Sequence, residues 1–493
     1  MGIKTAAARW LAKREMKAVR AWSEGPHRAQ ERTFRFLCGV LAGTDFGRDH
    51  GITASTTQEE WARKVPLRDY EGLKPYIERI KEGEINVLWK GKPTYFCKTS
   101  GTTSGTKYIP MSDHGIKAQV KAAWTALLCY IDETKNARFV DGKMIFLQGS
   151  PEMTYLQGIG VGRLSGIVAH HVPSYLQRSR MPSWQTNCIE DWEQKVDAIV
   201  AETKDQDMRL ISGIPPWVQM YFERLLQHTG KATIKELFPN FSVFAHGGVN
   251  YQPYKATMEK LIGGHVDSIE TYPASEGFIA FQDRQGEEGM LLNLAGGIYY
   301  EFVPVNGIHD PSARRLGLKE VLVGVNYAIV LNTSSGLWGY IIGDTVKFTS
   351  LNPFRIVVTG RIKHFISAFG EHVIAEEVER SMTEVCENLG IEINEFHVAP
   401  QVSPTDGLPY HEWFIESQND LPAAMAQQLN ERMCSLNSYY KDLIEGKVLQ
   451  PLIIRRLNPG AFNRYMASVG RLGGQNKLPR LSNDRSVVEG MLG

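Results

Sequence analysis

The sequence has 493 residues, more than one hydrophobic core usually holds, so at least two domains are expected. Its 55 basic and 54 acidic residues give a formal net charge of +1, so the composition gives no reason to expect a nucleic-acid partner. Hydrophobic residues make up 43% and aromatic residues 10% of the chain, as in large globular enzymes.

The six cysteines lie far apart and show no paired spacing, which predicts free thiols in a reducing compartment. No apolar run is long enough to cross a membrane. The basic N-terminus lacks the apolar core of a secretory signal and predicts a packed amphipathic helix instead. We therefore expect a cytoplasmic protein without a membrane partner. The sequence leaves the oligomeric state open, a monomer included.

Residues 1–45 predict helices, and strands then alternate with helices over most of the chain. Strands are predicted at 93–97, 143–148, 241–245 and 268–272, and helices at 112–131 and 215–226. Such alternation predicts an α/β domain whose functional side chains collect where strands end. The strand at 268–272 is expected to break at Pro273. From 297 to 348 the pattern predicts strands only.

The pattern changes after the turn Thr359-Gly360-Arg361. The remaining chain predicts the order β-α-β-β-α-β, which is a compact α+β unit. Its elements are expected at 364–369, 373–389, 395–399, 410–416, 421–442 and 451–457. We place the boundary between 360 and 364, which gives a large domain at 1–360 and a small one at 361–493.

The stretch Thr99–Lys107 is a hydroxyl- and glycine-rich loop between two extended segments. Its two glycines allow backbone N–H groups to approach a phosphate, and its hydroxyls and Lys107 add donors and positive charge. The spacing differs from the usual nucleotide-binding loop, because three residues separate Gly101 from Gly105 and Tyr108 follows the lysine. The loop predicts an anion site, although a flexible Ser/Thr/Gly turn is the alternative.

Other polar clusters follow predicted strands or lie at the domain boundary. They are His246-Gly247-Gly248, Tyr272–Glu276, Tyr340–Asp344 and Gly360-Arg361. Taken singly, each is more often a turn, a hairpin or a surface ion pair than a site. Their combination in this order is more specific.

Together these motifs resemble the adenylate-forming superfamily of acyl and aryl ligases. More closely, the chain resembles the auxin-responsive promoter (GH-three) family of acyl-acid amido synthetases, in its bacterial form. The anion loop is similar to that family's first motif, and Tyr272–Glu276 and Tyr340–Asp344 match its Tyr-x-x-Ser-Glu and Tyr-x-x-Gly-Asp motifs. The resemblance extends to 44–48, 65–70 and 474–480, so it spans nearly the whole chain.

The resemblance implies a large adenylate-forming domain of helix-flanked β-sheets and a small, mobile α+β domain. It implies that ATP activates a carboxylic acid as an acyl adenylate with release of pyrophosphate, and that an amine, most simply an amino acid, then displaces AMP to form an amide. Magnesium would accompany ATP, because this hard cation prefers carboxylate and phosphate oxygens. Neither the acyl acid nor the amine is named by the sequence.

The resemblance also assigns roles to residues. The triphosphate would lie on Ser100, Gly101, Thr102, Thr103 and Ser104. Adenine would lie against Gly247, Gly248 and Tyr272, and the ribose would contact Asp344 and Arg361. Ser275 belongs to the nucleotide-binding motif, and Glu276 would contact magnesium during catalysis. Lys477 matches the mobile lysine that neutralises charge at the reacting carboxylate and α-phosphate.

One position departs from the superfamily, because His364 stands where Asp or Lys usually forms the hinge. Two alternatives to the amide-forming enzyme remain: an acyl-CoA ligase with the same first half-reaction, and a nucleotide-binding protein without turnover. His170-His171 could bind a metal, but no carboxylate or cysteine spacing supports such a site. Cys97 could suggest a thioester, but a packed strand thiol is the simpler interpretation.

Overall fold

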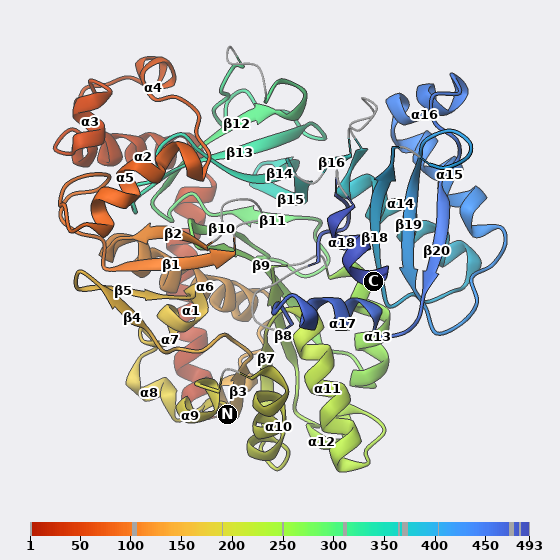
Figure 1. Cartoon of the computed structure of the whole chain (residues 1–493). Coiled ribbons are helices and arrows are strands. Elements are labelled where there is room, and N and C mark those ends of the chain that lie inside the picture. The colour runs from red at the N-terminus through yellow and green to blue at the C-terminus, as the bar shows by residue number, and fades with distance from the viewer. Residues whose placement is uncertain are drawn as a thin grey trace. The chain divides into compact units, whose positions relative to one another are not determined.

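The computed structural model describes residues 2–100, 106–189, 191–248, 251–308, 313–362, 365–366, 373–402, 404–472, 478–482 and 485–492. Its contacts divide the chain into two compact units (Figure 1). The first comprises Met1–Ile342 and Val346–Val357, and the second comprises Gly343–Thr345 and Val358–Gly493. In the described part of the chain, no helix is long and apolar enough to cross a membrane.

The first unit contains one large mixed sheet, and the expected α/β architecture is confirmed. In sheet order its strands are β12 (Ile298–Pro304), β13 (Asn326–Thr333), β14 (Tyr340–Leu351), β15 (Phe354–Arg361), β11 (Met290–Leu292), β10 (Gly277–Phe281), β9 (Asp267–Ala274), β8 (Val243–Gly247), β7 (Met208–Ser212), β3 (Lys143–Phe146) and β6 (Arg180–Met181). Strands β9, β8, β7, β3 and β6 run parallel, so their carboxyl ends share one edge of the sheet.

Helices cover both faces of the parallel strands, because successive side chains point to opposite faces. Ile211 and Phe244 pack with α10 (Trp192–Thr203), α11 (Pro215–Thr229) and α13 (Gln252–Ile262). Their neighbours Leu210 and Val243 pack instead with α1 (Ile3–Ser23) and α6 (Asp113–Thr134). Figure 1 shows α11 and α13 beside β8. The near-continuous apolar strands are therefore explained by burial on both faces.

A smaller sheet carries the predicted anion loop. Its order is β2 (Thr106–Met111), β1 (Tyr95–Ser100), β5 (Ile159–Gly162) and β4 (Thr154–Leu156). Strands β1 and β2 form an antiparallel hairpin in which Lys98 lies opposite Tyr108 and Ser100 opposite Thr106. The hairpin leads into α6, whose first turn is capped by the Ser112 hydroxyl accepting the Gly115 N–H at 3.0 Å.

The sequence misplaced the ends of two strands of the large sheet. Strand β8 continues through Gly247 instead of ending at Ala245, and β9 continues through Pro273 to Ala274. Pro273 is tolerated because its exposed ring lies opposite Phe278, at the end of a hairpin where one ladder hydrogen bond can be lost. Strand β9 therefore ends immediately before Ser275.

The second unit has a three-stranded sheet of β18 (Glu395–Gln401), β19 (Tyr410–Glu416) and β20 (Ile453–Leu457). Helix α14 (Ala375–Leu389) was predicted closely. The helix predicted at 421–442 is instead two helices, α15 (Met425–Leu436) and α16 (Ser438–Glu445), because Asn437 breaks it and accepts the Tyr440 N–H at 2.8 Å. Helices α17 (Ala461–Ser468) and α18 (Ser486–Leu492) were not predicted.

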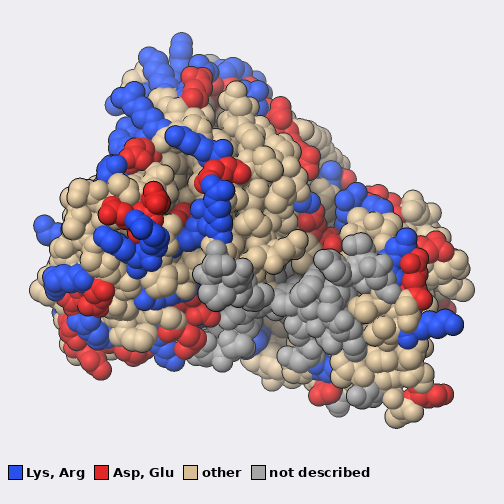
Figure 2. Space-filling view, turned by 90° about the horizontal axis from the view of Figure 1, so that it is seen from above, with Lys and Arg blue, Asp and Glu red and all other residues tan. Residues whose placement is uncertain are grey.

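The first strand expected in this unit, at 364–369, is also corrected. In the described residues it is β16 (Phe365–Ile366), paired only with β17 (Val373–Ile374) and separate from the three-stranded sheet. Residues 363–364 and 367–372, including the hinge position His364, lie outside the described residues. On the face shown in Figure 2, acidic and basic side chains are interspersed, as their nearly equal numbers lead one to expect.

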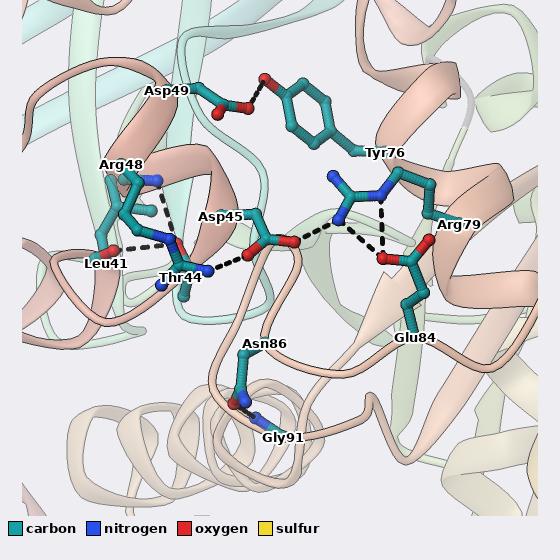
Figure 3. A network of polar contacts seen from close by, with 11 residues as sticks. Leu41, Thr44, Asp45, Arg48, Asp49, Tyr76, Arg79, Glu84, Asn86 and Gly91 are labelled. Carbon is teal, nitrogen blue, oxygen red and sulfur yellow. Dashed lines mark hydrogen bonds and ion pairs between the residues drawn. The ribbon is translucent and has the colours of Figure 1, made fainter.

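The Thr44–Arg48 stretch forms a tight turn between α2 (Pro26–Leu41) and α3 (Asp45–Asp49) (Figure 3). The Thr44 hydroxyl donates to the Leu41 carbonyl at 2.8 Å and accepts the Gly47 N–H at 3.1 Å. The Asp45 carboxylate lies between the guanidinium groups of Arg48 and Arg79. These contacts tie the turn to α5 (Tyr70–Lys81).

Gly47 is required by this turn, because a Cβ atom there would lie 1.9 Å from the Leu41 carbonyl oxygen. We predict that Gly47→Ala lowers the free energy of unfolding by at least about 1–3 kcal/mol, since backbone must move to admit the methyl group. Gly39→Ala is the matched control, because a Cβ on this exposed α2 residue meets nothing within 4 Å. The control should gain about 0.5–1 kcal/mol. The measurement is urea denaturation monitored by tryptophan fluorescence. Equal changes in the free energy of unfolding of both variants would contradict the prediction.

Candidate functional site

The carboxyl ends of β8 and β9 approach each other closely at Gly247. Gly247 lies opposite Thr271 in the parallel register, and a Cβ on Gly247 would lie 2.2 Å from the Thr271 carbonyl oxygen. Gly248 follows with a φ of +82°, a backbone conformation that glycine adopts readily. Glycine is therefore required at 247 because β9 itself occupies the position of a side chain there.

The Tyr272–Glu276 motif forms the hairpin between β9 and β10. Ala274 pairs with Gly277, which leaves Ser275 and Glu276 as a two-residue loop. Gln119 on α6 donates its amide N–H to the Ala274 carbonyl at 2.6 Å and is itself buried. The loop is thus fixed from outside the sheet, with Ser275 buried and Glu276 half-buried.

Two motifs far apart in the sequence meet at Glu276. The Tyr340 hydroxyl at the start of β14 donates to Glu276 Oε1 at 3.3 Å, and Tyr340 is only 1% exposed. The Cys97 thiol of β1 has a pKa well above its ordinary range. Burial is the main cause, and the negative charge of Glu276 adds to it. The structure therefore brings parts of two predicted motifs together at Glu276. Cys97 is confirmed as a buried strand thiol.

The stretch before Tyr340 is held by residues 65–68. The Arg68 N–H donates to the Gly339 carbonyl at 2.9 Å, and the Ile341 N–H donates to the Arg68 carbonyl at 2.8 Å. Gly339 has a φ of +57°, and a Cβ there would lie 2.5 Å from the Pro66 carbonyl oxygen. This backbone pairing fixes where β14 begins, and so where the Tyr340 ring lies.

The Arg68 side chain rests on aromatic rings instead of a carboxylate. Its guanidinium lies 5.1 Å from the centre of the Phe46 ring and 2.9 Å from His50 Nε2. The His50 ring stacks on Phe46 with centroids 4.0 Å apart, and burial lowers the pKa of His50. A neutral His50 can therefore accept the Arg68 N–H. The 44–48 and 65–70 motifs meet here.

A buried ion pair supports the same stretch from the other side. Arg315 pairs with Glu301, each side chain being 4% exposed, and Arg315 also donates to the Val65 carbonyl. Asn332 donates to Glu301 at 2.8 Å and accepts the Gly339 N–H at 2.7 Å. The carboxylate is paired and hydrogen-bonded, which is what offsets the cost of burying it.

Tyr70 connects the same segment to the anion-loop hairpin. Its buried hydroxyl accepts the backbone N–H of Tyr108 in β2 at 2.9 Å. The Lys107 ammonium lies 5.6 Å from the centre of the Tyr70 ring. One short segment, 65–70, therefore positions both the start of β14 and the outer strand of the hairpin.

His246 lies just before the glycine pair and is 4% exposed. Its Nδ1 atom has no hydrogen-bond partner in the described part of the chain, and its ring lies 4.4 Å from that of Tyr251. Burial lowers the pKa of His246 to about 4. The imidazole is therefore neutral at physiological pH and belongs to the packing of the strand end.

Several predicted site residues are placed only in part. Asp344 lies on β14 and is 8% exposed. It belongs to Gly343–Thr345, the part of this strand that is included in the second compact unit. Arg361 is the last residue of β15, and Ser100 the last of β1. Gly101, Thr102, Thr103, Ser104 and Lys477 lie outside the described residues.

His170 and His171 are engaged in other contacts. His170 Nε2 lies 2.8 Å from the Pro151 carbonyl, and His171 Nε2 lies 2.9 Å from the Tyr95 hydroxyl. Within the described ranges, no three His, Cys, Asp or Glu side chains are grouped to hold a metal ion.

The roles of Gln119 and Tyr70 as positioning residues were not predicted from the sequence. Gln119 lies in the middle of an amphipathic helix, where nothing local marks it as a donor to a distant loop. Tyr70 belonged to a motif noted for its resemblance, and an aromatic residue in the first turn of a helix is ordinarily core. Only the tertiary contacts reveal these roles.

Tyr70→Phe should loosen the hairpin without unfolding the protein. Losing the acceptor leaves the Tyr108 N–H unsatisfied, at a cost of about 1–3 kcal/mol. We expect faster amide hydrogen exchange in a peptide covering β2, by about tenfold or more. Tyr76→Phe, on the same helix, removes only the 2.8 Å contact to Asp49 and should leave β2 unchanged. Equal protection of β2 in wild type and Tyr70→Phe would refute the role of the hydroxyl.

Comparisons with known proteins find relatives that match most of the chain. The jasmonoyl–L-amino acid synthetase GH3.5 of Oryza sativa subsp. japonica is 22% identical, over 92% of this chain and 92% of its own. The indole-3-acetic acid-amido synthetase GH3.3 of Arabidopsis thaliana is 22% identical over 93% and 90%. The match to the jasmonoyl–L-amino acid synthetase JAR4 of Nicotiana attenuata, also 22% identical, spans 64% of this chain and 66% of that protein.

Solved structures show the same fold. The GH3.15 acyl acid amido synthetase superposes with a TM-score of 0.80 at 15% identity, covering 97% of this chain and 95% of that one. A 2-hydroxyisobutyryl-CoA ligase in its postadenylation state gives 0.59 at 12% identity, covering 94% and 90%.

Three successive parts of the sequence match the three domains of one family. Residues 15–199 match the GH3 family N-terminal domain, residues 291–361 its central domain and residues 376–486 its C-terminal domain. These matches together cover more than half of the sequence, and the chain belongs to the GH3 family.

Proposed function

We propose that this protein is an ATP-dependent ligase that joins a carboxylic acid to an amino acid. In the first step a carboxylate oxygen attacks the α-phosphorus of ATP and pyrophosphate leaves. In the second the amine nitrogen attacks the acyl carbon, AMP leaves, and the nitrogen loses a proton. The observation that carries this proposal is the match to all three GH3 domains, whose curated relatives are named as jasmonoyl- and indole-3-acetic acid-amido synthetases.

The chemistry of the described residues supports nucleotide binding at the ends of β8 and β9. The glycine pair Gly247-Gly248, beside Tyr272 in the adjacent strand, is proposed to lie against the adenine ring. Asp344 can accept hydrogen bonds from a ribose diol, and Arg361 is proposed to contact the same sugar. Ser275 lies at the turn of the same motif. The triphosphate would be held by the loop from Ser100 to Ser104.

Glu276 is proposed to hold the magnesium ion that accompanies ATP. Its carboxylate suits this cation, and the 3.3 Å hydrogen bond from Tyr340 holds one of its oxygens in place. The bound metal would supply charge neutralisation on the phosphates.

We propose further that residues 361–493 form a small mobile domain that carries Lys477 to the reacting groups. A mixed anhydride is already activated, so the enzyme needs no covalent intermediate of its own, and its work is positioning and charge stabilisation. All six cysteines are free thiols, which supports our proposal that the enzyme works in the cytoplasm.

Lys477→Ala should separate the two half-reactions. Removing a cation aimed at developing negative charge costs about 10²–10³ in rate, so acid-dependent pyrophosphate release should fall by that factor while ATP still binds. Transfer from a supplied acyl adenylate should suffer much less. Lys441→Ala, which removes an exposed lysine of α16, is the control. Equal damage to both half-reactions would make Lys477 a general structural element.

The identity of the acceptor separates this proposal from an acyl-CoA ligase. We expect mass spectrometry to find an amide after the protein is incubated with an acid, ATP, magnesium and mixed amino acids, and no thioester with coenzyme A. The yield should rise with pH toward the amine's pKa, because only the neutral amine attacks. A thioester without any amide would establish the acyl-CoA ligase. Nucleotide binding without pyrophosphate release across a broad panel of acids would favour the non-catalytic alternative.

A further inference from the structure

A second polar cluster lies at the same sheet edge, two strands from Gly247. Its members are Gln148, which follows β3, Arg180 of β6, Asn187 of α9 (Trp184–Asn187) and Lys195 of α10. Because β8, β7 and β3 are parallel and adjacent, their carboxyl ends lie in a row. None of these four side chains has a role in the site described above.

Arg180 reaches along β3 toward this edge. Its backbone lies opposite Met144, and its guanidinium stacks 5.4 Å from the centre of the Phe146 ring. One terminal nitrogen donates to Gln148 Oε1 at 2.7 Å and the other to the Ala169 carbonyl at 3.4 Å, whereas the Nε atom is buried without a hydrogen-bond partner among the described residues. Burial lowers the pKa of Arg180 to about 10, so the group is still a cation at neutral pH.

Lys195 lies behind Gln148 and is 2% exposed. Its ammonium donates to the Gln148 carbonyl at 3.0 Å and to the Asn187 carbonyl at 2.6 Å. Burial lowers the pKa of Lys195 to about 8, which leaves it mainly protonated at neutral pH. A buried cation, Lys195, and a half-buried one, Arg180, therefore both contact Gln148.

These cations lack an anionic partner in the part of the chain that the structure describes. Among the side chains that the structure describes, which do not include those of Glu190 and Glu193, the partners of Arg180 and Lys195 are carbonyl and amide oxygens and not carboxylates. Gln148 is 8% exposed, yet its Nε2 donor has no acceptor among the described residues. Unpaired buried charge and unsatisfied buried donors are both costly, and an anion would remove both costs at once.

We propose that Arg180 and Gln148, backed by Lys195, form a binding subsite for a substrate carboxylate. The inference rests on the proposed ligase function. Neighbouring strands lie about 4.8 Å apart, so the ends of β3 and β8 are separated by about 10 Å, which is within the length of a small substrate. The carboxylate could be a second one on the acyl acid or the α-carboxylate of the acceptor amino acid.

Kinetics with matched substrates distinguishes these two sources. In one arm, pyrophosphate release is measured with α,ω-dicarboxylic acids and with monocarboxylic acids of equal chain length. In the other, amide formation is measured with amino acids and with the corresponding amines that lack the carboxylate. Each arm compares wild type with Arg180→Gln, Arg180→Lys and the control Arg178→Gln, which changes an exposed arginine two residues away.

Arg180→Gln should raise KM by about tenfold or more for the carboxylate-bearing substrate of one arm only. Its partner lacking that carboxylate should be unaffected. Arg180→Lys should restore part of the preference, and Arg178→Gln should match wild type. Gln148→Met should show the same selective loss, which guards against a fold defect peculiar to Arg180→Gln. A purely structural cluster would instead affect both members of each pair equally, and that result would overturn the proposal.

Calorimetric titration measures binding without turnover, so it tests the subsite separately from the proposed ligase function. The dicarboxylic acids and amino acids are titrated into wild type and Arg180→Gln without turnover. Selective weakening in Arg180→Gln supports the subsite even if no amide is ever formed. Identical binding by both proteins, or binding by neither, would overturn the subsite while leaving any observed ligase activity intact.

Discussion

The backbone pairing between Arg68 and the first residues of β14 is the constraint on which the candidate site depends. It is a short parallel bridge between segments more than two hundred residues apart, and it holds the residue that contacts Glu276. A glycine is needed at 339, because Pro66 approaches too closely for any side chain. The bridge belongs to a segment whose next aromatic residue, Tyr70, holds the hairpin of the anion loop. A single connection therefore sets the geometry of two motifs.

This arrangement explains why polar groups can be buried around the site. The Arg68 guanidinium lies against Phe46 and a neutral His50, and the Arg315–Glu301 pair is completed by Asn332. Each charge is offset in part by a ring face, an ion pair or hydrogen bonds, while one nitrogen of Arg68 and one of Arg315 are buried without a hydrogen-bond partner among the described residues. Rigid positioning follows, because such contacts are lost together if the segment shifts. Positioning of this kind is what a reaction with an already activated intermediate requires.

Much of the fold could be predicted because local chemistry and tertiary structure agree. The Ser112 cap, the apolar stripe of α6 and the buried parallel strands each leave a local pattern. A strand end and a helix were predicted wrongly where a local rule met a tertiary exception. Pro273 remains in β9 because the loss of one hydrogen bond is tolerated at a hairpin end. The predicted helix at 421–442 is divided because Asn437 caps a new helix. An asparagine within an amphipathic pattern does not by itself indicate that a helix ends there.

The candidate site was predictable only as a set of motifs, not as contacts. Glycine pairs and hydroxyl-rich turns are recognisable because few other residues allow backbone to approach a ligand. The hydrogen bond from Tyr340 to Glu276 joins two such motifs, yet neither sequence stretch encodes the distance between them. Gln119 and Arg180 carry no local signal at all, since their roles arise from where α6 and β6 pack. The parallel strand ends then have different characters along one edge: a glycine pair at the end of β8, and cations beside β3. A sheet edge divided in this way can hold a flat ring and an anionic group of different substrates side by side.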